Sequence, residues 1–249
     1  MPGVLQGNAA RAIERAGFLC GVAFVLTSVI QGCVHGLDWR ADLLWATVFG
    51  VSAIVLLAVA GTLGIRVLLR SHLPAEIARG NVAAGIAAGA HYAATGLIIA
   101  RCLYGDDVGI LGVSVVFFVI AQATLHLFVV LFRTLTLYAE DQEIIGENVA
   151  AALSYAGVML AIAVIVGHAA QGDFAGWGTS LRLYGLAVIS ALLLFPVRQL
   201  AVQTWLLRQP FSLRGGNLDR MVAQERNVGV AAVEAVSYLS VAFLLTGII

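Results

Sequence analysis

The sequence contains no lysine, and charged residues of either sign are scarce. Its 14 basic residues are all arginine, 14 acidic residues balance them, and charged residues make up 11% of the 249 positions. A chain without net charge has no strong field that would attract nucleic acid, so we expect no nucleic-acid partner. The missing lysine also excludes a retinal-binding pump, because retinal is held as a Schiff base on a lysine amine.

Cysteines and catalytic motifs are equally sparse. Cys20, Cys33 and Cys102 are scattered and lack CxxC spacing, which excludes a disulfide framework and a cysteine zinc site. No GxSxG, HExxH, P-loop or Rossmann motif occurs in a suitable context. We therefore expect a protein that is not an enzyme and that carries neither a cofactor nor a catalytic metal.

Apolar residues, in contrast, are abundant and come in long runs. Hydrophobic residues make up 61% of the chain, far more than one water-soluble core could bury. A helix of about 20 apolar residues crosses a bilayer, and seven such runs are present. They are residues 17–35, 43–65, 82–104, 108–132, 149–169, 178–197 and 228–249. The sequence predicts an all-α, polytopic membrane bundle of seven transmembrane helices.

The arginines are distributed unevenly over the connecting segments. Most follow the even-numbered spans or precede the first one: Arg11, Arg15, Arg66, Arg70, Arg79, Arg133, Arg198, Arg208, Arg214, Arg220 and Arg226. Only Arg40, Arg101 and Arg182 lie near the other ends of the spans. Since basic loops stay in the cytoplasm, we expect a cytoplasmic N-terminus and an outer C-terminus.

One polar phrase recurs three times at the start of an apolar run. It reads "EIARGNVAAG" at 76–85, "EIIGENVAAA" at 143–152 and "VAQERNVGVA" at 222–231. Aligning the asparagines gives three helix-hairpin repeats after a leading helix. The predicted divisions are residues 1–42 for the N-terminus and leading helix, then 43–107, 108–177 and 178–249, the last with an interfacial segment over 199–217.

The recurring phrase suits the start of a tightly packed helix. Asn81, Asn148 and Asn227 each precede a run of small residues and can cap the helix by accepting a backbone N–H bond. Glu76 and Glu143 lie near helix N-termini, where the helix dipole favours negative charge. This pattern predicts a structural joint; the alternative is a ring of Asn and Glu that contacts an ion or a partner.

The same phrase also resembles a known family. The stretches "EIARGNVAAGIAAG" and "EIIGENVAAALSYAG", with "ERNVGVAAVEA" as a weaker copy, are similar to the bacterial membrane family called domain of unknown function 350 (DUF350). The resemblance implies a small multi-span protein of the bacterial inner membrane without a settled biochemical activity. The third copy departs from the motif, because Val222 replaces the leading acid and Gly229 interrupts the alanines.

Three ionisable residues fall inside the predicted spans. Glu234 and His126 lie at similar depths in the half of the membrane nearer the arginines, and His91 lies somewhat nearer the middle. Such residues often mark proton or cation paths. The alternative is that each one hydrogen-bonds a neighbouring helix. A more distant alternative is a b-type haem protein, with His35 and His168 as one axial pair and His91 and His126 as another.

Two hypotheses of function remain open at this point. The first is movement of a small ion or a proton-coupled solute along Glu234, His126 and His91. The second is a membrane scaffold or stress sensor whose Arg-rich loops, especially 198–226, bind anionic lipid or an unidentified protein partner. Spans rich in small residues also predict a homo-oligomer surrounded by membrane lipid.

Overall fold

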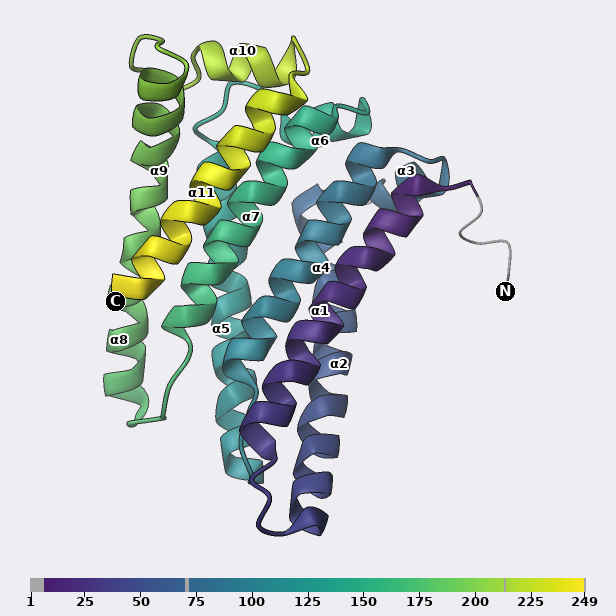
Figure 1. Cartoon of the computed structure of the whole chain (residues 1–249), viewed down its shortest axis with the longest axis vertical. Helices are drawn as coiled ribbons and strands as arrows, with labels where there is room; N and C mark the ends of the chain where they lie inside the picture. Colours follow the sequence, from purple (N-terminus) through teal and green to yellow (C-terminus); the bar gives the residue numbers. More distant parts are fainter. Residues whose placement is uncertain (1–6, 70–71, 213, 249) are drawn as a thin grey trace.

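The chain folds into a bundle of helices (Figure 1). The computed structural model describes residues 7–69, 72–212 and 214–248, and no β-strand occurs among them. Six of its helices are long and apolar enough to cross a membrane, and a shorter apolar helical segment covers Trp177–Leu193. The prediction of an all-α polytopic membrane bundle is therefore confirmed.

Four helices form a row at the front of the bundle in Figure 1. They are α1 (Ala9–Cys33), α4 (Val82–Cys102), α7 (Val149–Ala169) and α11 (Val228–Ile248), and each packs on the next. Behind them lie α2 (Trp39–Leu69), α5 (Val108–Arg133) and α8 (Trp177–Ile189). In the most apolar stretch of each helix, 72% of α4 and 78% of α7 is buried, against 22% of α1 and of α11. The core therefore lies around α4 and α7.

Glycines allow the helices of the front row to approach closely. A side chain on Gly17 of α1 would overlap the backbone of Gly89 on α4, and one on Gly157 of α7 would overlap Ala235 on α11. Helices in lipid associate through such close packing, because apolar burial alone does not distinguish a neighbouring helix from a lipid tail. The glycines that end the longer stretches 76–89 and 143–157 thus lie at helix–helix contacts.

The sixth predicted span differs from the prediction. It was expected to end at residue 197, before an interfacial helix, but helical structure continues through a 3₁₀ turn at Ser190–Leu193, α9 (Leu194–Pro196) and a π-helical segment, η2 (Val197–Leu206). Pro196 lacks a backbone N–H and crowds the preceding turn, which disturbs regular α-helical bonding. Gln199 and Gln203 are buried, so this segment packs within the bundle, against α11.

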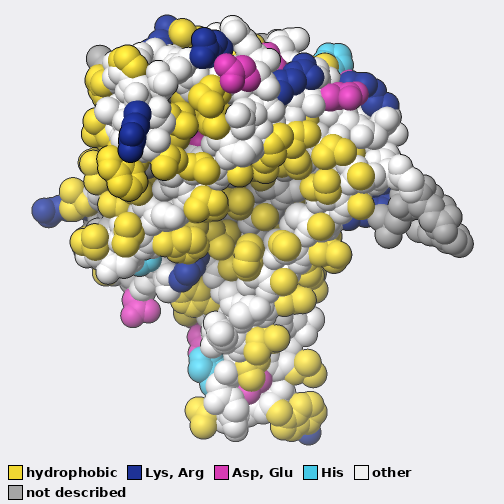
Figure 2. Space-filling view, turned by 45° about the horizontal axis from the view of Figure 1, so that its top comes forward, with side chains coloured by type: hydrophobic (Ala, Val, Ile, Leu, Met, Phe, Trp, Pro, Cys, Tyr) yellow, Lys and Arg dark blue, Asp and Glu magenta, His cyan; other side chains and the backbone are white. Residues whose placement is uncertain are grey.

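Three short helices lie together at one end of the bundle. These are α3 (Leu73–Ala78), α6 (Glu140–Ile145) and α10 (Asn217–Ala223), each directly before a front-row helix. Figure 2 shows arginine and acidic side chains gathered mostly at this end, with apolar side chains over the middle of the bundle. Of the arginines predicted to share this end, Arg70 and the side chain of Arg198 lie outside what the structure describes. Which end faces the cytoplasm stays a prediction.

Candidate functional site

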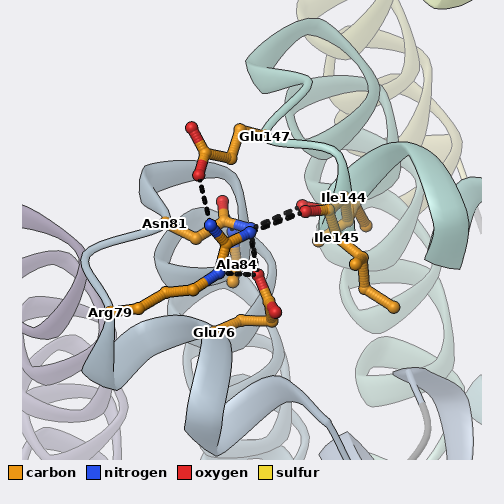
Figure 3. Close-up of polar contacts among 7 residues, drawn as sticks. All are labelled: Glu76, Arg79, Asn81, Ala84, Ile144, Ile145 and Glu147. Atoms are coloured by element: carbon orange, nitrogen blue, oxygen red, sulfur yellow. Dashed lines mark hydrogen bonds and ion pairs between the residues drawn. The ribbon is translucent and has the colours of Figure 1, made fainter.

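Asn81 ties the start of α4 to two short helices (Figure 3). Its Oδ1 accepts a hydrogen bond from the backbone N of Ala84 at 3.1 Å, and its Nδ2 donates to Glu76 Oε2 at 2.8 Å and to the Ile144 carbonyl of α6 at 2.8 Å. The side chain is 1% exposed. One carboxamide therefore caps its own helix and also satisfies the C-terminal carbonyl of the next short helix.

Asn148 makes the equivalent contacts at the start of α7. Its Oδ1 accepts from the backbone N of Ala151 at 3.2 Å, and its Nδ2 donates to Glu143 Oε2 at 2.9 Å and to the Val222 carbonyl of α10 at 3.0 Å. Asn227 caps α11, accepting from the backbone N of Val230 at 3.1 Å. Asn81 with Glu76, and Asn148 with Glu143, thus form hydrogen-bonded joints between helices, whereas the bond described for Asn227 caps its own helix.

The sequence reasoning missed a fourth asparagine of this kind. Asn8 caps α1 through the backbone N of Arg11 at 2.9 Å and donates to the Ile77 carbonyl of α3 at 2.8 Å. The signal was present in the sequence, since "GNAA" at 7–10 resembles "GNVA" at 80–83.

The residue before each of these asparagines shares one backbone conformation. Gly7, Gly80, Glu147 and Arg226 all have positive φ, at 99°, 97°, 62° and 50°. This left-handed conformation ends the segment that precedes each front-row helix and costs a non-glycine residue energy. The capping asparagine therefore follows a residue of the same backbone conformation in all four helices of the row.

Ion pairs lie around the joints and involve three of the arginines at this end, Arg79, Arg133 and Arg220. Arg79 bonds Glu76 at 2.7 Å and Glu147 at 2.6 Å, and the bonds from Arg79 and Asn81 hold the pKa of Glu76 below its usual range. Arg133 lies 3.3 Å from both Glu140 and Asp141, and Arg220 lies 3.3 Å from Glu225. These arginines contact acids of the same chain.

Glu234 lies inside the bundle, where α11 packs on α7. Its side chain is fully buried, Ser154 of α7 donates a hydrogen bond to its Oε2 at 2.9 Å, and the Tyr238 hydroxyl donates to its Oε1 at 3.2 Å. Tyr238 also packs edge to face on Phe132 of α5. Ser154 and Tyr238 were not identified from the sequence, because only the packing of α7 on α11 brings Ser154 to the carboxyl group.

His91 and His126 lie against each other between α4, α5 and α2. Their ring centroids are 5.6 Å apart and the rings are inclined by only 4°. His91 is fully buried, and Gln122 of α5 places its Nε2 3.4 Å from His126 Nε2 and 3.3 Å from the Thr95 hydroxyl. Gly64 of α2 faces both rings, since a side chain there would overlap them.

The structure thus joins the two histidines, whereas the described contacts of Glu234 are with Ser154 and Tyr238. A continuous path through all three residues stays a prediction. Gly64 packs against both imidazoles, which leaves no room for a haem macrocycle between His91 and His126. His35 is exposed in the loop after α1 and His168 lies in the last turn of α7, so a haem on that pair stays a prediction. Within the described residues, no cluster of three His, Cys, Asp or Glu side chains is placed to hold a metal.

A pocket of about 530 Å³ lies at the opposite end of the bundle from the joints. Apolar side chains of α5 and α8, among them Val113, Phe117 and Leu183, form one part of its wall, and the loop at 169–174 forms another. None of the predicted site residues lines it.

Comparisons with known proteins place the chain among membrane proteins. A family model described as Domain of Unknown Function (DUF350) matches residues 3–103 and 107–249. A UPF0719 transmembrane protein of Aquifex aeolicus (strain VF5) is 24% identical over 241 residues, which cover 95% of this chain and 84% of the relative. No solved structure gives a significant match.

Proposed function

Because the chain belongs to the DUF350 family, whose description assigns no activity, we propose from its interior that it moves protons, or a small ion coupled to protons, across the membrane. In this proposal Glu234 is the group that takes up and releases the proton. The proposal includes a homo-oligomer in the bacterial inner membrane, in contact with membrane lipid and with its N-terminus in the cytoplasm.

The observation that carries the proposal is the complete burial of Glu234 within a spanning helix. An ionisable group at such a depth costs several kcal/mol unless its surroundings solvate it, and such groups commonly line ion or proton pathways. Ser154 and Tyr238 each present a hydroxyl to the carboxyl group. A hydroxyl can donate to a carboxylate or accept from a carboxylic acid, so this pair can solvate Glu234 in both protonation states.

The scaffold alternative receives less support from the same structure. It requires basic side chains that are free to bind anionic lipid or a partner. Arg79, Arg133 and Arg220 instead contact acidic side chains of the chain itself. An arginine already paired with a carboxylate attracts a second anion less strongly, so these three arginines contribute less to a basic surface than unpaired ones would.

The experiment compares proton flux in liposomes that carry the wild type, Glu234→Gln or Glu225→Gln. Glutamine keeps the size and hydrogen bonding of glutamate but cannot ionise, so we expect the buried substitution to abolish flux driven by a pH gradient. Glu225 is a half-exposed acid at the end of the bundle, and its substitution serves as the matched control with wild-type flux. Equal flux in both variants, or none in folded wild-type protein, contradicts the proposal.

A further inference from the structure

We propose that His91, His126 and Gln122 form a binding site for an imidazole-preferring transition-metal cation, Zn²⁺ or Cu⁺, opposite Gly64. This site is separate from the Glu234 contacts and does not depend on the function proposed above.

The first observation is a set of buried polar atoms without partners. Among the described residues, neither ring nitrogen of His91 has a hydrogen-bond partner, and Gln122 Oε1 has none either. The Ala60 carbonyl of α2 faces the His91 ring, but not in normal hydrogen-bond geometry. Leaving such atoms unpaired in an apolar interior costs free energy, and an ion bound to His91 Nε2 would remove part of that cost.

The second observation is that the Nε2 atoms of the two histidines lie close together against Gly64 of α2. A methyl group built on Gly64 would overlap His91 Nε2 and would lie 2.8 Å from His126 Nε2. Both Nε2 atoms therefore point toward the part of α2 where a side chain is missing. Since both Nε2 atoms lie within 2.8 Å of that one point, they approach each other closely enough to bind one ion between them.

The third observation concerns the spacing between Gln122 and His126. The Gln122 amide atom nearest His126 Nε2 is 3.4 Å away. Two ligands that each lie about 2.1 Å from a tetrahedral ion are about 3.4 Å apart. Amide oxygen and nitrogen are assigned from the hydrogen-bond network, so rotating the amide places Oε1 at this position. The Thr95 hydroxyl, now 3.3 Å from Nε2, would then donate to that oxygen.

The ligand chemistry selects the class of ion. Two imidazoles and an amide oxygen are neutral ligands, whereas Mg²⁺ and Ca²⁺ prefer carboxylates and water. Imidazole suits Zn²⁺ and copper, and the fully buried position of His91 favours the ion of lower charge, because desolvation costs less for Cu⁺. Three protein ligands leave one coordination position open for water or for a further group.

The test measures metal bound to the purified full-length protein. The protein carries an affinity tag without histidine, is freed of metal with a chelator and is offered Zn²⁺, Cu⁺ under reducing conditions, or Mg²⁺. We expect a single Zn²⁺ or Cu⁺ per chain by elemental analysis after gel filtration, and no Mg²⁺. Added Co²⁺ should give the visible absorption of a site with nitrogen ligands. Failure of the wild type to retain Zn²⁺, Cu⁺ or Co²⁺ overturns the proposal.

Two glycine variants keep the test independent of misfolding. Gly64→Ala keeps every ligand in the chain, but its methyl group would overlap His91 Nε2 and crowd His126 Nε2, so the rings must shift apart and binding should weaken at least tenfold. Gly50→Ala lies on the same helix, where an added methyl would meet only Val29 at 3.9 Å, and should bind metal as the wild type does. His91→Gln should also lose the ion, whereas Glu234→Gln should retain it. Metal binding that survives both Gly64→Ala and His91→Gln places the ion elsewhere and refutes the site.

Discussion

A single carboxamide can serve two helices because it carries both an acceptor and a donor. Asn81 uses Oδ1 for the free N–H groups that begin its own helix and Nδ2 for the free carbonyls that end a neighbouring one. Aspartate could cap the helix, but it has no amide hydrogen for the carbonyl. Serine and threonine carry a single hydroxyl for both roles, whereas asparagine has a separate acceptor and donor atom. Asparagine at positions 81 and 148 is suited to these two simultaneous hydrogen bonds.

Glu76 makes the joint sensitive to acid. Its pKa is lowered in the folded protein, first by the hydrogen bond from Arg79 and also by the bond from Asn81, so the ionised form is favoured in the folded state. The stabilisation is complete above the ordinary pKa of 4.5 and is lost as pH falls through the lower folded pKa. We expect the thermal unfolding temperature in detergent to drop below pH 4.5 by less in Glu76→Gln than in the wild type.

The exposed acid Asp173 provides the comparison for that measurement. It lies in the loop after α7, and Asp173→Asn should leave the acid sensitivity of the wild type unchanged. A Glu76→Gln protein that unfolds with the same pH profile as the wild type would mean that this carboxyl group contributes nothing to the acid transition.

At the scale of the helices, the spans were predictable because they are long apolar runs. The predicted span 149–169 coincides with α7, and 108–132 falls one residue short of the end of α5. The first two spans begin earlier in the structure than predicted, at Ala9 and Trp39, because helical hydrogen bonding continues through polar turns that a hydropathy argument leaves out. The extension of the sixth helix to Leu206 depends on burial against α11, which the local sequence does not reveal.

The polar contacts inside the bundle were less predictable than the membrane spans. The three ionisable residues were identified because charge is conspicuous in an apolar run. Their partners Ser154, Tyr238 and Gln122 are common in membrane helices, and only the orientation of each helix shows which of them faces a neighbour. Gly64 was missed for the same reason, since it matters through the rings that pack on it.

The joints also allow a prediction of how much one asparagine contributes to the free energy of unfolding. Asn148→Ala removes the cap of α7, worth about 1 kcal/mol. It also leaves the Val222 carbonyl of α10 without its partner, which costs a further 1–3 kcal/mol or so in a buried position. We therefore expect Asn148→Ala to lower the free energy of unfolding by roughly 2–4 kcal/mol, measured by denaturant titration in mild detergent.

Asn227→Ala is the matched substitution for that titration. Asn227 is half-buried, and the hydrogen bond described for its side chain is the cap of α11. The expected loss is therefore about 1 kcal/mol. Equal losses at the two positions would show that the bond from Asn148 to α10 adds no stability.

At the scale of the whole molecule, the positions of the short helices allow the orientation of the bundle in the membrane to be tested directly. Helices α3, α6 and α10 share one end, and the loop between α1 and α2 lies at the other (Figure 1). The excess of arginine at the first end predicts that it faces the cytoplasm. A cysteine at Glu225, beside α10, should then react with a membrane-impermeant maleimide only in broken cells.

A cysteine at Leu37, which is 95% exposed in the loop between α1 and α2, should react in intact cells, whereas the native Cys33 and Cys102 are buried. The reverse labelling pattern would place the joints outside the cell. Glu234 and the paired histidines would then lie nearer the outer surface, because they belong to the half of the bundle that carries the joints. Proton uptake by Glu234 would in that case respond to the external pH, so the labelling result decides from which side the flux experiment should be driven.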